Sequence, residues 1–246
     1  MRLIMLFTIF SVTLFSQTPD SLFMRANRYF ETEQFEAAAR AYEKLSAQVE
    51  HEDLYLNLGN AYFRIGNIGQ AIWAYEKGHM LSPRDQDINY NLNFVRAQVR
   101  DRIQPPDDFI VVAFYRAIIE KFNIIDLFSI GGFLFMALGG IYLLRNKGFS
   151  FGKIDGLVNS ILIAAVIATG WIMLDKYWAV SEEQAAIVIS SAVDVRSAPI
   201  ARGENVVFRI HEGTKVDITT SQPGWIEVIL LDGKKGWIPV GEVRTL

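Results

Sequence analysis

Two long apolar runs limit the folds open to this chain of 246 residues more than any other feature. The run over residues 124–144 has a single charged residue, Asp126, near its start, and the run over residues 157–174 has none. At a rise of ~1.5 Å per residue, each helix would cover about 27–31 Å, close to the hydrocarbon thickness of a bilayer. The sequence therefore predicts a multidomain membrane protein with a two-helix transmembrane hairpin over residues 124–144 and 157–175.

The polar loop between these runs, residues 145–156, contains Arg145, Lys147 and Lys153, which favour the cytoplasm. The outer flanks of the two runs carry as many basic residues, so loop charge alone leaves the orientation undecided. Neither run has an ionisable residue near its middle, where a transporter or a proton relay would need one. We therefore expect an anchor rather than a conducting path.

The N-terminus supplies the missing orientation. Arg2 precedes an apolar run over residues 3–15, and Ser16 follows, which is the order of a signal peptide over residues 1–16. An N-terminal anchor that is not cleaved is the alternative, because Leu14 is a poor residue three positions before the cut. Both versions export the segment that follows. The loop is then cytoplasmic, and the N-terminal and C-terminal parts lie outside the cytoplasm.

Composition excludes several classes of function. A formal net charge of −3 argues against a nucleic-acid surface, and the absence of cysteine excludes disulfides, thiolate metal sites and a cysteine nucleophile. The three histidines lie in separate segments, and no GxSxG, HExxH or phosphate-binding glycine loop occurs. We therefore expect no catalytic residue, no cofactor and no metal, and a protein that is not an enzyme.

A tetrapeptide, AYEK, occurs at residues 41–44 and again at residues 74–77, which is a spacing of 33 residues. When the two copies are aligned, Gly59 falls on Ala26, so both segments have a small residue at this position. The second copy fits the tetratricopeptide (TPR) repeat closely in residue kind and spacing. Each copy is therefore predicted to be a pair of short helices.

The spacing has a physical cause. Small residues at Gly59 and Ala71 let the two helices of a unit cross closely, and Pro83 ends the second helix. Two units bury too little core, so the segment from Asp87 is expected to form the first helix of a third unit or a capping helix. The sequence predicts an all-α TPR superhelix over residues 17–103.

The first helices of TPR units line a concave face. By resemblance to other adaptors of this kind, this face is expected to hold a peptide or a partner segment. Asparagines on such a face can hydrogen-bond an extended backbone, and aromatic rings can take side chains. The lysines that clamp a C-terminal carboxylate in some TPR proteins are missing, and a purely structural repeat without a groove ligand is the alternative. The predicted partner-binding residues are Phe23, Asn27, Asn57, Asn60, Arg64, Tyr90, Asn91 and Phe94.

Residues 104–123 connect this domain to the first apolar run. Ile110, Phe114, Ile118 and Phe122 recur at steps of four and predict an amphipathic juxtamembrane helix. It lies either on the outer bilayer surface or against the TPR domain.

The C-terminal part, residues 185–246, follows a linker over residues 176–184 and has short β-branched and aromatic runs broken by glycine and proline. Asp232 and Gly233 form a tight-hairpin signal. Many short strands within so few residues predict a small all-β barrel. The ordered motifs VDVRSAP, HEGTKVDI, GWIEV and DGKKGWIPV resemble a bacterial SH3 domain.

The candidate surface residues of this SH3-like domain are Trp237, Trp225 and Arg196. Tryptophan offers a large rigid face to a ligand. The alternatives are that Trp225 belongs to the barrel core and that Arg196 fixes a turn. The resemblance implies a module that binds peptide or peptidoglycan outside the cytoplasm.

The order of signal segment, TPR units, two spans and SH3-like domain resembles the BatE family of the Bacteroides aerotolerance operon over essentially the whole chain. The resemblance implies a non-enzymatic scaffold of the bacterial inner membrane, with both modules in the periplasm and a role in envelope stress. It implies protein partners, among them von Willebrand A domain membrane proteins and, indirectly, a MoxR-type ATPase. The rival hypothesis is a peptidoglycan-binding envelope sensor that acts through the SH3-like domain.

Overall fold

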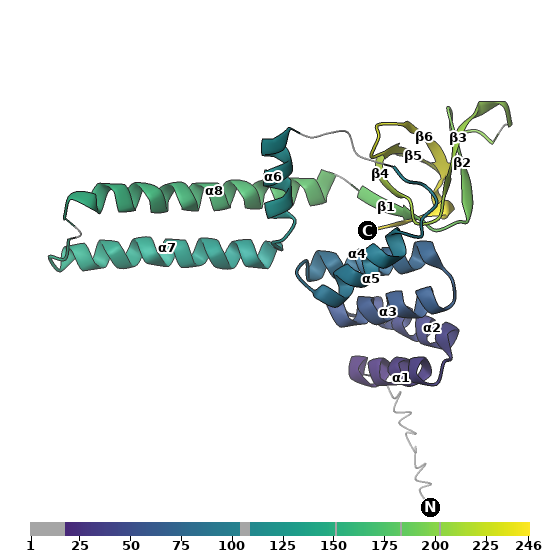
Figure 1. The fold of residues 1–246 in the computed structure, drawn as a ribbon, viewed down its shortest axis with the longest axis horizontal. Coiled ribbons are helices and arrows are strands. Elements are labelled where there is room, and N and C mark those ends of the chain that lie inside the picture. Colours follow the sequence, from purple (N-terminus) through teal and green to yellow (C-terminus); the bar gives the residue numbers. More distant parts are fainter. Residues whose placement is uncertain (1–17, 104–108, 151, 183, 202) are drawn as a thin grey trace, which may run out of the picture.

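The computed structural model describes residues 18–103, 109–150, 152–182, 184–201 and 203–246. The predicted signal peptide over residues 1–16 and residues 104–108 of the predicted juxtamembrane segment lie outside the described residues. Figure 1 shows a stack of short helices with a β-sheet module against it, and a pair of long helices that project to one side.

The helical stack consists of antiparallel neighbours that pack in chain order, first with second, second with third and so on. The side chains of Thr18, His51 and Asp85 accept backbone N–H bonds at the starts of the first, third and fifth helices, which satisfies donors that a helix start leaves free. The helices are α1 (Pro19–Glu31), α2 (Phe35–Ser46), α3 (Glu52–Arg64), α4 (Ile68–Leu81) and α5 (Gln86–Arg96).

The repeated tyrosine makes the same contact in both helix pairs. The Tyr42 hydroxyl donates to Asn27 Oδ1 at 2.6 Å, and the Tyr75 hydroxyl donates to Asn60 Oδ1 at 2.7 Å. The Tyr75 ring lies so close to Gly59 that a β-carbon there would come within 2.5 Å of it. The close crossing expected from the small residue is therefore present, and the arrangement of helix pairs is TPR-like.

The turns inside the two pairs also correspond. Glu33 has a φ of 59° and Gly66, one repeat later, has a φ of 83°. Glycine adopts this left-handed region without strain, whereas glutamate does so at a cost. The third element is the single helix α5, which buries Ile88, Leu92 and Val95 and stands in the place of the predicted capping helix or first helix of a third unit.

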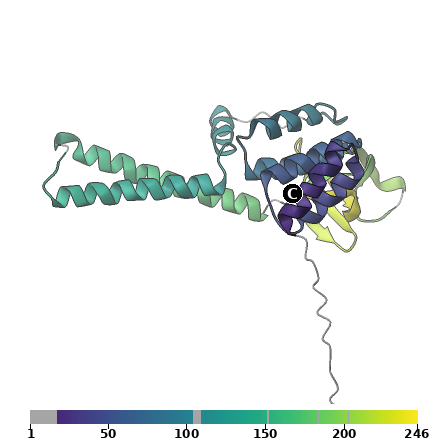
Figure 2. The same ribbon diagram turned by 90° about the horizontal axis from the view of Figure 1, so that it is seen from below.

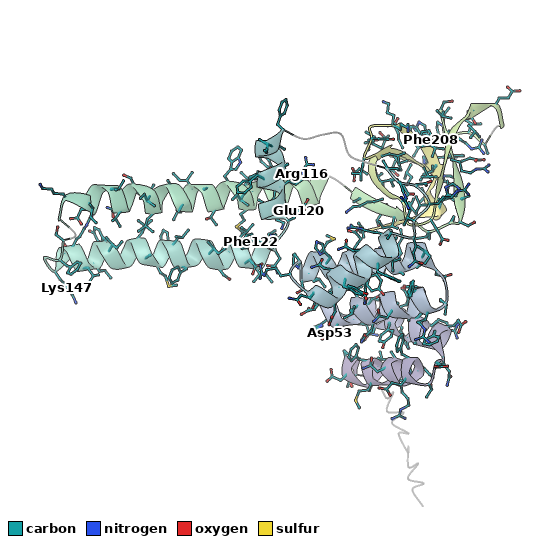
Figure 3. All side chains as sticks on the ribbon, in the orientation of Figure 1. Asp53, Arg116, Glu120, Phe122, Lys147 and Phe208 are labelled. Carbon is teal, nitrogen blue, oxygen red and sulfur yellow. The ribbon has the colours of Figure 1, made fainter. Side chains whose placement is uncertain are left out.

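The long helices are α7 (Ile124–Asn146) and α8 (Asp155–Glu182), which pack against each other and are joined through a short 3-10 turn, η1 (Gly152–Ile154). Both are long and apolar enough to cross a membrane, as the sequence predicts. Only 6% of the most apolar window of α7 and 0% of that of α8 are buried, unlike the core helix of a soluble protein. Lys147 lies at the far end of the pair (Figure 3).

The segment predicted as a linker, residues 176–184, is helical for most of its length, because α8 continues to Glu182. No glycine or proline interrupts residues 175–182, so nothing stops the helix where the apolar run ends. The helix therefore extends beyond the apolar run toward the first strand.

A short helix, α6 (Ile110–Ile119), runs across the axis of the long pair (Figures 1 and 2). The Tyr115 hydroxyl donates to Asp175 Oδ2 at 2.8 Å, and Lys176 Nζ donates to the Ile119 carbonyl oxygen at 2.9 Å. These bonds tie α6 to α8, while Lys121 and Phe122, just after α6, contact Arg84, which follows the end of α4.

The C-terminal strands form one antiparallel sheet in the order β3-β2-β6-β5-β4-β1-β7. The predicted Asp232-Gly233 turn joins the fifth strand to the sixth, and Gly233 has a φ of 83°. The strands are β1 (Gln184–Val188), β2 (Ala192–Arg196), β3 (Val206–His211), β4 (Lys215–Gln222), β5 (Trp225–Leu230), β6 (Lys235–Pro239) and β7 (Val243–Thr245).

The predicted closed barrel is not confirmed. Among the described strands, β3 and β7 form the two ends of the sheet and do not pair with each other. The reason lies in β7, which turns toward the helices: Trp73 Nε1 donates to the Thr245 carbonyl oxygen at 2.7 Å. The C-terminal strand thus contacts α4 through this bond and does not pair with β3.

Candidate functional site

The helical stack and the sheet form one body. β1 packs against α4, and Ile187 belongs to the core of the helical stack rather than to that of the sheet. At Gly69 an added β-carbon would lie 2.5 Å from the Val188 carbonyl oxygen, so the two backbones touch there. The C-terminus lies between the sheet and α4 (Figure 1), and Leu246 packs on the helical core.

Arg244 of β7 is the centre of this interface. Its two terminal nitrogens donate to the two carboxylate oxygens of Glu43 at 2.6 Å and 2.9 Å, and one of them also donates to Gln70 Oε1 at 2.8 Å. The guanidinium carbon lies 3.2 Å from the centroid of the Trp73 ring. Burial raises the pKa of Glu43, but the bonds from Arg244 and from the Tyr62 hydroxyl outweigh it and hold this pKa below its ordinary value.

The second repeated glutamate is bound in a similar way. Glu76 is 3% exposed, accepts a bond from Arg96 Nη2, and accepts another from Lys215 Nζ of β4 at 3.2 Å. Burial raises the pKa of Glu76, but Lys215 and Arg96 outweigh it, and the pKa lies below its ordinary value. The glutamate of each AYEK copy therefore binds a cation of the C-terminal sheet, which gives this position of the repeat a role beyond helix packing.

A third contact lies where α5 runs into the following segment. Asp101 accepts bonds from the His211 backbone N–H at 2.6 Å and the Thr214 hydroxyl at 2.9 Å, and it lies 2.8 Å from His211 Nδ1. Burial raises the pKa of Asp101, but these bonds lower it below its ordinary value. Sequence reasoning missed the whole interface, although the repeated glutamates were a visible signal.

The interface leaves one face of the stack open. The sheet contacts α2 through Glu43 and α4 through Gly69, Trp73 and Glu76. These are the second helices of the two pairs. The predicted partner-binding residues lie on the first helices, α1 and α3, and on α5.

The structure brings four of these predicted residues together with one that the sequence analysis missed. Asn91 Nδ2 donates to Asn60 Oδ1 at 3.1 Å, which joins α5 to α3. Tyr90 and Phe94 stack with a centroid distance of 6.4 Å and an interplanar angle of 12°. The Phe94 ring also lies edge-on to Phe63, 5.7 Å between centroids. We call Asn60, Phe63, Tyr90, Asn91 and Phe94 the α3–α5 surface.

This surface is open to solvent where the rings are. Tyr90 is 71% exposed and Phe94 is 51% exposed, which is unusual for a stacked aromatic pair in a folded module. The side-chain oxygen of Asn60 already accepts bonds from Tyr75 and Asn91, so its N–H groups are the donors left for a ligand.

The remaining predicted residues lie elsewhere. Asn27 accepts a bond from Tyr42, and the Phe23 ring lies 6.1 Å from that tyrosine at the α1 end of the stack. The Arg64 guanidinium carbon lies 4.1 Å from the centroid of Phe35, which holds it at the start of α2. Asn57 is half-buried on α3. These four residues do not adjoin the stacked rings of α5 through any contact named above.

The three predicted surface residues of the sheet share its outer face. Ile226 and Val228 of β5 are buried, so Trp225 points to the opposite side and is half-buried, which decides against Trp225 as a core residue. Trp237 of β6 is paired with Glu227 on one side and with Arg196 on the other. Arg196 Nη1 also donates to Asn205 Oδ1 at 3.0 Å, so Arg196 braces the turn before β3, which is the alternative role considered for it.

Comparison with known proteins gives a fold likeness only. No protein-family model matches the chain, and no curated protein matches it. The TPR domain of Sgt2 from Aspergillus fumigatus is 25% identical, covering 38% of this chain and 67% of that one, with a TM-score of 0.33. The Yersinia enterocolitica type III secretion chaperone SycD, in complex with a peptide of the translocator YopD, is 15% identical over 64% of this chain and 93% of that one, with a TM-score of 0.31.

NlpC2 from Trichomonas vaginalis is 10% identical, covering 26% of this chain and 25% of that one, with a TM-score of 0.24. Since these TM-scores are below 0.5, the likenesses carry no functional conclusion for this chain. The TPR-like arrangement rests on the helix pairs themselves, and the resemblance to the BatE family stays a prediction.

Proposed function

We propose that this chain is a membrane-anchored, non-enzymatic adaptor that binds a segment of a protein partner on its α3–α5 surface. One observation carries the proposal: the sheet contacts the second helices of the stack, while Tyr90 and Phe94 of α5 form a stacked aromatic pair that stays exposed. Exposed rings beside asparagine donors suit an extended peptide, whose side chains pack on the rings and whose carbonyl groups accept the N–H bonds.

The anchor in this proposal is the helix pair α7–α8. Its apolar side chains are exposed over most of both helices, which fits a surface in contact with lipid. The loop with Arg145, Lys147 and Lys153 then lies in the cytoplasm and the body of helices and sheet lies in the periplasm of a bacterial inner membrane. The predicted domain boundaries are part of the proposal, with α8 extended to Glu182.

The body acts as a single binding unit in this proposal. The contacts of Arg244 and Glu76 fix the SH3-like sheet to the helices, so the two modules are not separate arms that reach for different surfaces. The family resemblance also suggests partners, which are von Willebrand A domain membrane proteins and, indirectly, a MoxR-type ATPase. It suggests a role in envelope stress as well, and we include both in the proposal.

Affinity capture from detergent-solubilised membranes tests the proposal. We expect the double substitution Tyr90→Ala and Phe94→Ala to reduce capture of the partner about tenfold or more, since aromatic anchors dominate such interfaces. Leu231→Ala is the matched control, because Leu231 is 47% exposed in the turn after β5 and lies off the α3–α5 surface. Undiminished capture by the double variant would reject this surface as the binding site.

The peptidoglycan-binding sensor is the second candidate, and one observation favours it. Trp225 and Trp237 lie on the outer face of neighbouring strands, where aromatic faces can stack on a sugar or a stem peptide. Co-sedimentation of the full chain with purified sacculi, compared with the Trp225→Ala and Trp237→Ala variants, tests it. Loss of co-sedimentation in both variants, with partner capture unchanged, would favour the sensor.

A further inference from the structure

A pocket of about 400 Å³ lies at the α1 end of the stack, but a second and smaller one lies where the body meets the helix pair and has the more distinctive chemistry. This joint pocket has a volume of about 270 Å³. Its walls come from the end of α4, the loop before α7, and α8. The lining residues are His79, Met80, Pro83, Glu120, Asn123, Ile124 and Lys176.

The walls of the joint pocket are held rigidly. Asn123 Nδ2 donates to the Leu81 carbonyl oxygen at 3.1 Å, which fastens the start of α7 to the end of α4. Arg84 forms a two-bond ion pair with Asp126, at 2.8 Å and 3.0 Å. Lys176 and Glu120 are the charged side chains among the lining residues, and Asp126, next to the pocket, also attracts Lys176 electrostatically.

The joint pocket lies at the depth of lipid headgroups if the helix pair spans a bilayer. Tyr177 and Trp178, the two residues after Lys176, are 61% and 55% exposed, and exposed tyrosine and tryptophan mark the membrane–water interface. Helix α6 crosses the pair at the same end, and Glu120 and Phe122 lie between α8 and the start of α7 (Figure 3). Met80 and Ile124 supply apolar walls beside these charges.

The polar groups of the pocket suit a ligand with one anionic and one cationic group. Lys176 Nζ donates to the carbonyl oxygens of Ile119 and Phe122, so one of its three N–H donors is left. His79 Nδ1 is buried, with no hydrogen-bond partner in the described part of the chain, so the polar contacts to a ligand come from Lys176 and Glu120. Glu120 offers a carboxylate to an ammonium group.

We propose, resting on the membrane anchorage proposed above, that the joint pocket binds the headgroup of a phospholipid with a primary amine, of the phosphatidylethanolamine type. The phosphate lies at Lys176 and the ammonium at Glu120. A choline headgroup fits less well because its quaternary nitrogen has no N–H to donate to the carboxylate. A glycerol headgroup has no cation for Glu120. Bound lipid would fix the angle between the body and the membrane plane.

Native mass spectrometry of the full chain, released from phosphatidylcholine nanodiscs that contain a minor share of phosphatidylethanolamine or phosphatidylglycerol, tests this. The wild-type chain is expected to retain phosphatidylethanolamine preferentially. Lys176→Gln should lower this retention about tenfold, the usual scale for loss of one charge-assisted contact. Lys147→Gln, at the far end of the helix pair, is the control and should leave retention unchanged.

Glu120→Gln keeps the inference testable should Lys176→Gln disturb the fold, because Glu120 is an exposed side chain. It should abolish the preference for the ethanolamine lipid, and Glu120→Lys should shift retention to phosphatidylglycerol. Equal retention of the lipids by the wild-type chain, or unchanged selectivity in both Glu120 variants, would overturn the inference. Full competition by soluble phosphoethanolamine would also overturn it as a lipid site.

Resistance of each variant to alkaline extraction distinguishes failure of the proposed membrane anchorage from failure of the proposed lipid site. A wild-type chain that is extracted from membranes contradicts the proposed anchorage itself. A chain that resists extraction but shows no lipid selectivity contradicts only the joint pocket.

Discussion

Removing Arg244 measures how firmly the sheet is held on the helices. Arg244→Ala deletes a two-bond ion pair with Glu43 and a cation–π contact with Trp73. The two charged side chains are 25% and 31% exposed, so water screens the pair only in part. Hydrogen bonds to charged groups contribute about 1.5–3 kcal/mol and a cation–π contact about 1 kcal/mol.

Two features make the loss of stability smaller than the sum of these contributions. Glu43 keeps the bond from the Tyr62 hydroxyl after Arg244 is gone, and its partial exposure lets water hydrate the freed oxygen. We therefore expect Arg244→Ala to lower the free energy of unfolding of the body by about 2–3 kcal/mol. Arg244→Lys keeps the charge but loses the planar fork and the stack, so it should recover less than half of this loss.

The assay is urea unfolding of the full chain in detergent, followed by tryptophan fluorescence, in a double-mutant cycle with Glu43→Ala. The cycle should give a coupling free energy of about 1–2 kcal/mol between Arg244 and Glu43. Arg209→Ala is the control: Arg209 pairs with Asp194 at 2.7 Å but its side chain is 61% exposed, so its loss should leave the urea midpoint unchanged. A coupling near zero, or an equal effect of the control, would refute the clamp at Arg244.

Three further predictions follow from contacts within the body. Glu76→Gln should lower the free energy of unfolding of the body by about 3 kcal/mol at neutral pH. Because the folded-state pKa of Glu76 is lowered, the stability that its carboxylate contributes is present above the ordinary carboxyl pKa and is lost as pH falls through the folded value. Stability measured against pH should therefore fall less steeply in acid for the variant than for the wild-type chain. Glu33→Gly should stabilise by about 0.5–1 kcal/mol, whereas Gly66→Glu should destabilise, in thermal unfolding. Gly69→Val should open the sheet–helix junction to protease while circular dichroism keeps the helical signal, because its side chain meets the Val188 carbonyl oxygen.

Local sequence signals predicted the elements well where the pattern is periodic. The 33-residue spacing of AYEK predicted the helix pairs, and the Asp232-Gly233 turn predicted the hairpin between β5 and β6. The predicted span ends at residue 175 because hydropathy falls there, whereas no glycine or proline in residues 175–182 interrupts the helix. Helix α8 therefore continues to Glu182.

The candidate site was predicted in part. Asn60, Tyr90, Asn91 and Phe94 were placed on one face by the repeat register, and the structure brings them together. Phe63 was missed, although it lies three residues after Asn60 on the same helix and so on the same side. The repeat register predicts which face of a helix a residue lies on, but not which helices contact each other. It therefore could not show that Arg64 lies apart from these four residues.

The sequence by itself determined the features that depend on near neighbours: two apolar helices from their length and composition, helix pairs from a repeat, and strands from alternation and tight turns. Only the tertiary structure decided that the sheet lies on the second helices of the stack and remains an open sheet. The contacts responsible, such as Arg244 with Glu43, join residues 201 positions apart. A pair so distant has no local periodicity to reveal it, because its energy exists only after both modules have folded and met.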